Sequence, residues 1–212
     1  MKKLILLFVI AVIMGLAISY TPPIDRLPPI SGQAWGGMIL GGSVPAGGVP
    51  ACDPFGTTTA HSSHGNGGGY QIGTFFAAPV ADCTVNTMYL RANGSSGAVV
   101  RLAIYSAQLD DVTLKPLTQL AYTGEIAMES ADTWVSGALN TTLTLESAAA
   151  EGGYFLLNFM GDAGVTKQYN YNSDGEFVGR YLSATYPTWN TTWNTNDGAN
   201  SSQDIAIYAT TE

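Results

Sequence analysis

Between residues 169 and 193 the chain gathers aromatic rings among amides and acids, a combination suited to binding sugars. A flat ring covers the apolar C–H face of a sugar, while amide and carboxylate groups bond its hydroxyl edges. The alternative is that the rings plug one end of the domain as a small core of their own. The predicted ligand contacts are Trp189, Trp193, Tyr169, Tyr171 and Asn194.

The only two histidines of the chain, His61 and His64, have a spacing that lets two imidazoles share one metal ion. Asp53 is the nearest carboxylate in the sequence that could support such a site. Because the surrounding segment is rich in Gly and Ser, a solvated loop over residues 56–69 explains the same histidines without a metal.

No combination of residues points to catalysis. A Ser-His-Asp triad would have to use one of the two histidines, and the chain has no Gly-x-Ser-x-Gly nucleophile elbow. Glycoside hydrolysis needs two facing carboxylates, and Glu125 and Glu129 are the least arbitrary pair among the 16 acids. A strand with acidic edges explains that pair equally well, so we predict that the protein is not an enzyme.

Two kinds of covalent modification are suggested by the sequence. Cys52 and Cys83 are the only cysteines, and an even pair in an exported chain predicts a disulfide, with two free thiols as the alternative. Four Asn-x-Ser/Thr sequons are candidate glycosylation sites, each near a predicted turn: Asn93, Asn140, Asn190 and Asn200.

The N-terminus has the three parts of a secretory signal. Two lysines precede an apolar run, and small residues follow it, so residues 1–19 are predicted to be a signal peptide. Residues 20–50 are rich in Gly and Pro and predict an extended linker or arm. The alternative is an uncleaved membrane anchor with the Pro-rich segment as its stalk. We therefore expect a secreted or cell-surface location.

The charge of the chain limits its partners. Only 11% of the residues are charged, and residues 20–212 keep all 16 acidic side chains but only six basic ones, a net charge of −10. Nucleic acids require clustered cations, and an anionic membrane surface would repel such a chain after signal cleavage. Calcium and neutral sugars are compatible with this charge.

The elements that must position these side chains are short strands separated by turn residues. Residues 51–212 form the predicted domain, and within it 84–91 and 98–105 are expected to pair as a hairpin around the turn at 93–97. Trp134 lies in a strand pattern and is expected in the core. The segments with strand character are 70–77, 84–91, 98–105, 119–128, 133–138, 141–145, 154–160, 177–184 and 204–210. Eight or nine such strands predict an all-β sandwich.

Three stretches of the sequence resemble a known kind of domain. The stretches IGTFFAAPVADCTVNTMYLRANGSSGAVVRLAIYS, TWVSGALNTTLTLESAAAEGGYFLLNF and SQDIAIYA are similar to the opening, middle and closing strands of jelly-roll domains in secreted bacterial proteins and phage surface proteins. The resemblance covers about residues 70–209 and implies a carbohydrate-binding-like jelly-roll β-sandwich of antiparallel strands. It also implies a structural calcium ion, with Asp204 and Asp197 as the candidate ligands and ordinary acidic turn residues as the alternative.

Two functions follow as predictions. The first is a secreted or surface-displayed, non-catalytic binding module for glycans or other cell-surface polymers. The second is a structural subunit of an extracellular filament or layer. In that case copies would assemble through the arm at residues 20–50, whose apolar Trp35 and Ile39-Leu40 could add to the sheet edge of a neighbour.

Overall fold

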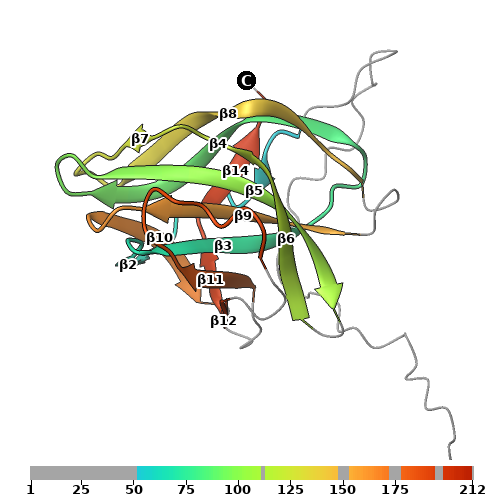
Figure 1. Cartoon of the computed structure of the whole chain (residues 1–212). Coiled ribbons are helices and arrows are strands. Elements are labelled where there is room, and N and C mark those ends of the chain that lie inside the picture. Colours follow the sequence, from blue (N-terminus) through green and yellow to red (C-terminus); the bar gives the residue numbers. More distant parts are fainter. Residues whose placement is uncertain (1–51, 111–112, 148–152, 172–177, 194–197, 212) are drawn as a thin grey trace, which may run out of the picture. The chain divides into compact units, whose positions relative to one another are not determined.

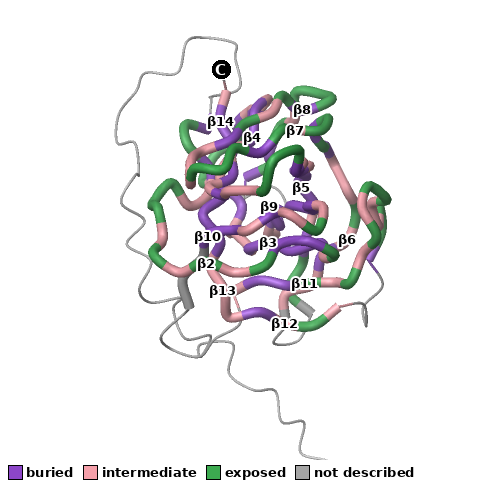
Figure 2. The backbone as a smooth tube through the Cα atoms, turned by 90° about the vertical axis from the view of Figure 1, so that its left-hand side faces the viewer, coloured by how far each residue is buried: buried purple, intermediate pink, exposed green. Residues whose placement is uncertain are grey.

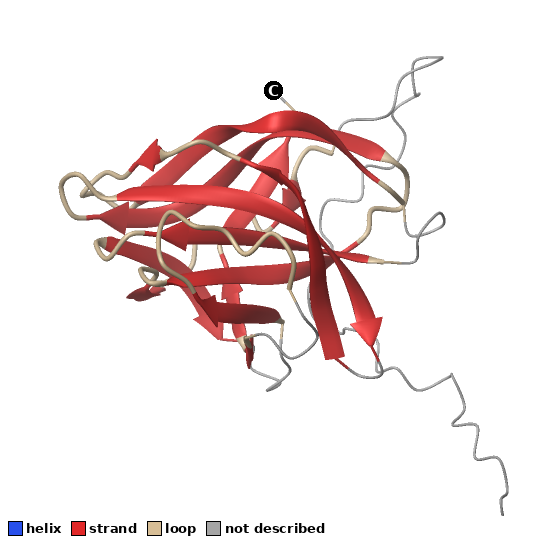
Figure 3. Cartoon of the chain, in the orientation of Figure 1, coloured by secondary structure: helices blue, strands red, loops and turns tan. Residues whose placement is uncertain are grey.

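The computed structural model describes residues 52–110, 113–147, 153–171, 178–193 and 198–211. Within these ranges every regular element is a strand, so the prediction of an all-β protein is confirmed. The strands form two sheets that lie face to face as a sandwich (Figures 1 and 3). The predicted signal peptide and arm, residues 1–19 and 20–50, lie outside the described residues. In the described part of the chain no helix is long and apolar enough to cross a bilayer.

The first sheet, called sheet A here, has seven antiparallel strands. The long strand β4 pairs with β8, β14 and β10, and β10 in turn pairs with β2 and β13. The short strand β1 pairs with β14. The strands of sheet A are β1 (Phe55–Gly56), β2 (Ser63–Asn66), β4 (Cys83–Gly94), β8 (Thr133–Leu145), β10 (Val165–Tyr171), β13 (Gln203–Ile205) and β14 (Ile207–Thr210).

The second sheet, sheet B, also has seven strands, in the order β12-β11-β3-β9-β5-β6 with β7 paired to β5. Its central pairs, β3 with β9 and β9 with β5, are antiparallel and regular over their whole length. The strands of sheet B are β3 (Tyr70–Ala77), β5 (Val99–Asp110), β6 (Thr113–Tyr122), β7 (Ile126–Ala127), β9 (Tyr154–Gly161), β11 (Gly179–Ser183) and β12 (Ala199–Ser201).

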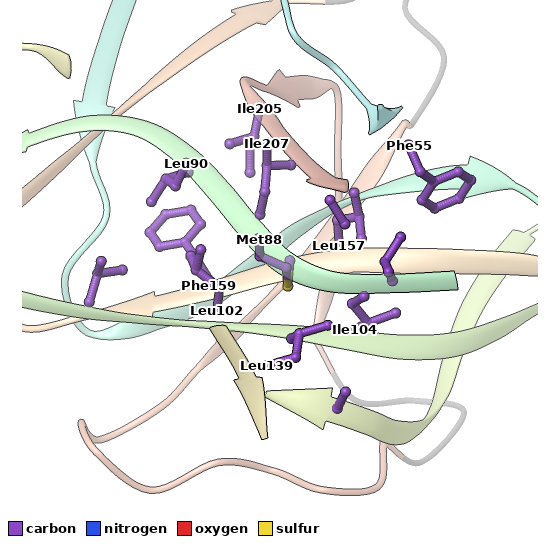
Figure 4. Packing of buried hydrophobic residues seen from close by; sticks show 14 of the residues in the cluster. Phe55, Met88, Leu90, Leu102, Ile104, Leu139, Leu157, Phe159, Ile205 and Ile207 are labelled. Carbon is purple, nitrogen blue, oxygen red and sulfur yellow. The ribbon is translucent and has the colours of Figure 1, made fainter. Parts of the chain in front are cut away.

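The main core lies between the two sheets (Figure 4). Successive side chains of a strand point to opposite faces, so every second residue of β5 enters this core. Val100, Leu102 and Ile104 do so, and none of the three is exposed to solvent. The opposite face of β5 carries Ala103 and Tyr105, which belong to a separate cluster. The strand character expected for residues 98–105 is therefore confirmed.

Sheet B is covered on both of its faces along β9, which explains why this strand is apolar almost throughout, with Asn158 as its one amide. Phe155, Leu157 and Phe159 enter the main core, whereas Leu156 packs with Trp193 in the second cluster. The segment after β11 supplies this second layer. In Figure 2 the tube of β3 is buried over a continuous stretch of four residues. A strand buried on both faces has no polar face, as its sequence predicts.

The cystine prediction is confirmed. A disulfide joins Cys52 to Cys83, and the backbone N–H of Cys52 donates to the carbonyl oxygen of Thr84. The start of the described chain is thereby fixed to the first residues of β4. The expectation of two free thiols does not hold.

The predicted hairpin over residues 84–91 and 98–105 is wrong. β4 belongs to sheet A and β5 to sheet B, so the turn between them passes from one sheet to the other. Both strands carry an apolar face, and each face is buried by lying opposite the other across the core. Gly97 has a φ of +83°, a left-handed conformation that glycine adopts without steric cost and that reverses the chain here.

Several strand boundaries also differ from expectation. Residues 133–138 and 141–145 form one strand, β8, and residues 119–128 divide between β6 and β7. β2 lies within the segment expected to be a loop, and β10 was not expected at all. The short strands β1, β2, β12 and β13 have two to four residues, too few for an alternation to be visible in the sequence.

Candidate functional site

The two predicted tryptophans belong to the second hydrophobic cluster. Trp193 is only 3% exposed, and its ring meets the ring of Tyr105 edge to face with the centroids 6.1 Å apart. Trp189 is half-buried and meets the same tyrosine at 6.4 Å. This arrangement corresponds to the alternative expectation, in which the rings form a small core of their own. The Trp193 ring offers no open face to a ligand.

A polar network fixes this cluster to sheet B. The Tyr105 hydroxyl donates to the backbone carbonyl oxygen of Asn190 at 2.7 Å and accepts from Gln71 and Gln119, each at 3.2 Å. The Asn190 side-chain amide in turn donates to the Gln71 carbonyl oxygen at 2.9 Å. Burial raises the pKa of Tyr105, so its hydroxyl stays protonated and able to donate.

A second clamp holds the same segment further along the sheet. The Tyr186 hydroxyl donates to a Glu125 carboxylate oxygen at 2.9 Å, and the Arg101 guanidinium lies 6.0 Å from the Tyr186 ring centroid. Arg101 also lies 3.6 Å from Glu125. Glu125, a candidate for paired-carboxylate chemistry, is thus engaged in a surface contact with a tyrosine and an arginine.

The other predicted contact residues are only partly described. Tyr169 and Tyr171 lie on β10, where their backbones pair with Ile205 and Gln203 of β13. Nothing is described of their side chains, and Asn194 lies outside the described residues.

A cleft lies where the two sheets separate at one edge of the sandwich. It has a volume of about 320 Å³, near the lower end of the usual range for small-ligand sites. Sheet A contributes residues of β2, β10 and β13, and sheet B contributes residues of β3, β11 and β12; these strands lie together in Figures 1 and 2. The lining residues are Asn66, Tyr70, Ile72, Lys167, Tyr181, Ser201 and Gln203.

Two tyrosine rings form the wall of the cleft on the side of sheet B. Tyr70 and Ile72 share one face of β3 because they are two residues apart, and Tyr181 of β11 is opposite Ile72 in the strand register. The rings of Tyr70 and Tyr181 meet edge to face, 6.0 Å apart with 82° between their planes. Tyr181 is 39% exposed, so part of its ring is open to solvent.

Polar groups face the rings from the neighbouring strands. Asn66 is exposed at the end of β2, and Ser201 and Gln203 come from β12 and β13, where the chain leaves sheet B for sheet A. The turn before β12 requires glycine: Gly198 has a φ of +74°, and a Cβ there would lie 2.3 Å from the carbonyl oxygen of Tyr181.

Lys167 is the charged group of the cleft. Its side chain is only 3% exposed, and its ammonium donates to the backbone carbonyl oxygen of Asn66 at 2.8 Å. Burial disfavours the charged form of the amine and lowers the pKa of Lys167 to about 8. The cleft thus combines two aromatic rings, neutral hydrogen-bonding groups and one lysine.

The two histidines contact different carboxylates. The Nε2 atom of His61 lies 3.6 Å from an Asp204 oxygen, and that of His64 lies 3.5 Å from an Asp132 oxygen. Asp53, the carboxylate expected to support them, instead accepts from the hydroxyl of Thr210. Among the described residues, no three His, Cys, Asp or Glu side chains converge on a point that could hold a metal.

Asp204, the first candidate calcium ligand, has protein partners on both carboxylate oxygens. The hydroxyl of Thr57 donates to one at 3.2 Å, and His61 faces the other. Asp197, the second candidate, lies outside the described residues. In the described residues, Asp204 therefore joins β13 to the segment before β2.

The four sequons differ in their surroundings. Asn140 lies within β8, not at a turn, and its side-chain oxygen accepts from the backbone N–H of Tyr122. Asn93 and Asn200 lie in β4 and β12. The side-chain nitrogen of Asn190, to which a glycan would be attached, donates to Gln71. A glycan on Asn190 would replace one of the two hydrogens of this nitrogen.

Trp134 was expected in the core, and the structure corrects this. The side chain is half-buried on β8 and belongs to neither buried cluster. Its ring meets Tyr208 edge to face at 5.0 Å, and Tyr208 stacks on Tyr89 at 4.5 Å. These three rings hold neighbouring strands of sheet A together from the side away from the core.

Sequence reasoning did not identify the cleft residues Tyr70 and Lys167, and it left Tyr181 unassigned within the aromatic cluster. One signal was present: Lys167 is two residues from the buried Val165, so on a strand it shares the face of an apolar residue. That signal depends on recognising β10 as a strand. Comparison with known proteins found no family model and no curated protein that matches this chain.

Proposed function

We propose that this protein is an exported, non-catalytic binding module of jelly-roll type, and that the cleft between Tyr70 and Tyr181 is its glycan site. The observation that carries the proposal is the pairing of two tyrosine rings with polar side chains at an open edge of the sandwich. An apolar wall with a few placed hydrogen-bonding groups is the usual composition of a small-ligand site.

The cleft suits a sugar because of the chemical groups that its side chains offer. The partly exposed ring of Tyr181 covers an apolar C–H face, and the amides of Asn66 and Gln203 and the hydroxyl of Ser201 are both donors and acceptors, as sugar hydroxyls are. The remaining wall residue, Ile72, is apolar and rigid. A ring-shaped polyol with one apolar face fits these surroundings better than a purely apolar ligand does.

Export is supported by the covalent structure. Disulfides form and persist in oxidising compartments, and the Cys52–Cys83 bridge joins the start of the described chain to β4. A secreted or cell-surface location is accordingly the one in which a glycan-binding module would meet its ligand.

The experiment is a glycan array probed with the wild-type protein and two tyrosine variants. Tyr181→Ala removes a cleft ring that is 39% exposed, and Tyr122→Ala removes a ring on β6 that is 40% exposed and does not line the cleft. The two substitutions remove equally accessible rings, so a general effect of surface truncation affects both. We expect binding to be lost in Tyr181→Ala and kept in Tyr122→Ala; equal loss in both, or in neither, argues against the cleft.

A further inference from the structure

We propose that Tyr89 and Tyr208 form a modification site, at which oxidation joins the two rings as dityrosine and ties β14 covalently to β4. The inference is independent of the glycan proposal, because it concerns the outer face of sheet A and not the cleft. It follows from the stacking of the two rings, from their accessibility, and from the place of β4 in the fold.

The strand register brings the two tyrosines together. Tyr208 of β14 lies directly opposite Tyr89 of β4 in the antiparallel pairing. Side chains that are directly opposite leave the sheet on the same face, so the hydroxyl ends of the two rings lie side by side. The ortho carbons, at which phenoxyl radicals couple, are the ring carbons next to each hydroxyl-bearing carbon. The register therefore places the reactive ends of both rings next to each other.

The rings are also parallel and in close contact. The angle between their planes is 5°, and their centroids are 4.5 Å apart, which is the short end of the range for aromatic pairs. The ring of Trp134 meets Tyr208 edge to face at 5.0 Å and thereby limits how far that ring can turn away. Tyr89 and Tyr208 are both half-buried, so part of each ring remains accessible to an oxidant in solution.

The coupling balances with a peroxide as the oxidant. Each phenol loses one electron and its hydroxyl proton and becomes a phenoxyl radical. The two radicals form a carbon–carbon bond between their ortho carbons, and the hydrogens on these carbons move to the oxygens, which restores both phenols. The two electrons and two protons that leave the pair reduce one hydrogen peroxide to two water molecules, as in a peroxidase reaction.

A second tyrosine pair of the same protein provides an internal comparison. The rings of Tyr70 and Tyr181 meet edge to face, with 82° between their planes and 6.0 Å between their centroids. The edge of one ring then points at the face of the other, so their ortho carbons do not lie side by side. Tyr181 is nevertheless 39% exposed and open to the same oxidant. Stacking, and not exposure, should therefore decide which pair couples.

A bond between Tyr89 and Tyr208 would fasten a second part of the chain to β4. The disulfide already joins Cys83, the first residue of β4, to Cys52 at the start of the described domain. Tyr89 lies further along the same strand, and Tyr208 belongs to the last strand, β14. A cross-link between distant positions restricts the unfolded chain, so the coupled protein should resist unfolding more strongly than the uncoupled protein.

The test treats the dilute purified protein with hydrogen peroxide and a peroxidase. The disulfide is then reduced, and the chain is cleaved before its aspartates. This cleavage places Tyr89 in a peptide of residues 82–109 and Tyr208 in a peptide of residues 204–212. Mass spectrometry detects the joined peptides, which are two hydrogens lighter than the sum of the separate ones, and fragmentation locates the bond.

The same digest separates the comparison pair. Tyr70 falls in residues 53–81 and Tyr181 in residues 174–196, so coupling of these two rings would give a different product. The variants are Tyr89→Phe and Tyr208→Phe, which keep the ring and remove the phenol. Tyr181→Phe is the matched control, because it removes an accessible phenol from a pair that is not stacked.

We expect the bond between Tyr89 and Tyr208 to be the main cross-link of the wild type at every protein concentration. It should be lost in Tyr89→Phe and in Tyr208→Phe and kept in Tyr181→Phe. Absence of this bond, an equal yield from the Tyr70 pair, or a yield that falls on dilution overturns the proposal. If a variant does not fold, the location of the bond and the dilution series of the wild type decide.

Urea unfolding tests the consequence for the fold. The oxidised wild type should unfold at a higher urea concentration than the untreated protein, and this shift should be absent in Tyr208→Phe. A shift of equal size in that variant assigns the effect to other oxidised residues and overturns the fastening role. No shift in a wild type that carries the bond overturns that role as well, while the modification site stands.

Discussion

The hydroxyl of Tyr105 donates a hydrogen bond to the backbone carbonyl oxygen of Asn190 at 2.7 Å. These two residues are 85 positions apart in the sequence, and their contact fixes the segment that carries Trp189 and Trp193 against the outer face of sheet B. The two tryptophans of the aromatic segment are thereby used in packing. The proposed ligand site lies instead at the edge of the sandwich, between Tyr70 and Tyr181.

Tyr105→Phe should destabilise the fold by about 1–3 kcal/mol, because it removes a buried hydrogen bond and leaves its partners unsatisfied. Those partners include Gln71, which is completely buried, and Gln119. Urea unfolding followed by tryptophan fluorescence measures the change. Tyr122→Phe, at an exposed position, is the control and should change the midpoint little. Equal midpoints for the two variants would show that the network does not stabilise the fold.

Trp193→Ala should cost about 3–5 kcal/mol of stability, the usual range for truncating a large buried aromatic side chain. The ring is 3% exposed, and it packs against Tyr105. Where the variant is still folded, its affinity for a bound glycan should be unchanged, because the ring does not line the cleft. A stable Trp193→Ala variant that has lost glycan binding would restore the original prediction of a tryptophan contact.

Replacing both Cys52 and Cys83 with Ser should destabilise the protein by about 3–4 kcal/mol. The bridge closes a loop of 31 residues in sequence, and without it the unfolded chain gains conformational freedom. Thermal and urea unfolding of the wild type with and without a reductant should show the same loss as the double variant. No difference between oxidised and reduced protein would contradict this account of the bridge.

Lys167 should make stability depend on pH between about 8 and 10. Burial lowers the pKa of this amine from 10.5 to about 8, so in this window the unfolded chain holds a proton that the folded chain has released. Stability therefore rises with pH, by about 1–2 kcal/mol across the window, and the contribution is lost as pH falls through 8. Lys167→Met should remove this rise when urea midpoints are compared at each pH.

Two tyrosines limit the pH range over which the effect of Lys167 on stability can be measured. Burial raises the pKa of Tyr105 and of Tyr208, so these groups stabilise the fold below pH 10, and the stabilisation is lost as pH rises through their raised pKa values. Their effect has the opposite sign to that of Lys167 and begins above the window. A wild-type rise between pH 8 and 10 that persists in Lys167→Met would assign it to another group.

The fold class could be predicted because the long strands have a recognisable sequence of buried and exposed residues. Residues 102–105 alternate between the two buried clusters, and the mostly apolar sequence of β9 reflects burial on both faces. The sheet to which each strand belongs was less visible, because β4 and β5 are both amphipathic and the turn between them suits a hairpin as well as a crossing between sheets. Pairing is decided by contacts with distant strands such as β9 and β14.

For the candidate site, the kinds of side chain could be predicted from the sequence, but not which residues form it. Aromatic rings near amides were expected to bind a sugar, but local sequence does not distinguish Trp193, which is buried by Tyr105, from Tyr181, which is partly exposed. Tyr70 and Lys167 are 97 positions apart and both line the cleft only because the start of β3 and the middle of β10 lie at the same edge of the sandwich. Such proximity follows from topology, which residue types alone do not specify.

The most direct test of the central claim is to map the bound ligand on the protein. Amide chemical shifts of the ¹⁵N-labelled wild type should be followed during titration with the glycan that binds best on the array. The account predicts that the largest shifts occur at the cleft residues Asn66, Tyr70, Lys167, Tyr181, Ser201 and Gln203. Shifts centred on the loop of Trp189 and Trp193, or on the outer face of sheet A at Trp134 and Tyr208, would contradict it.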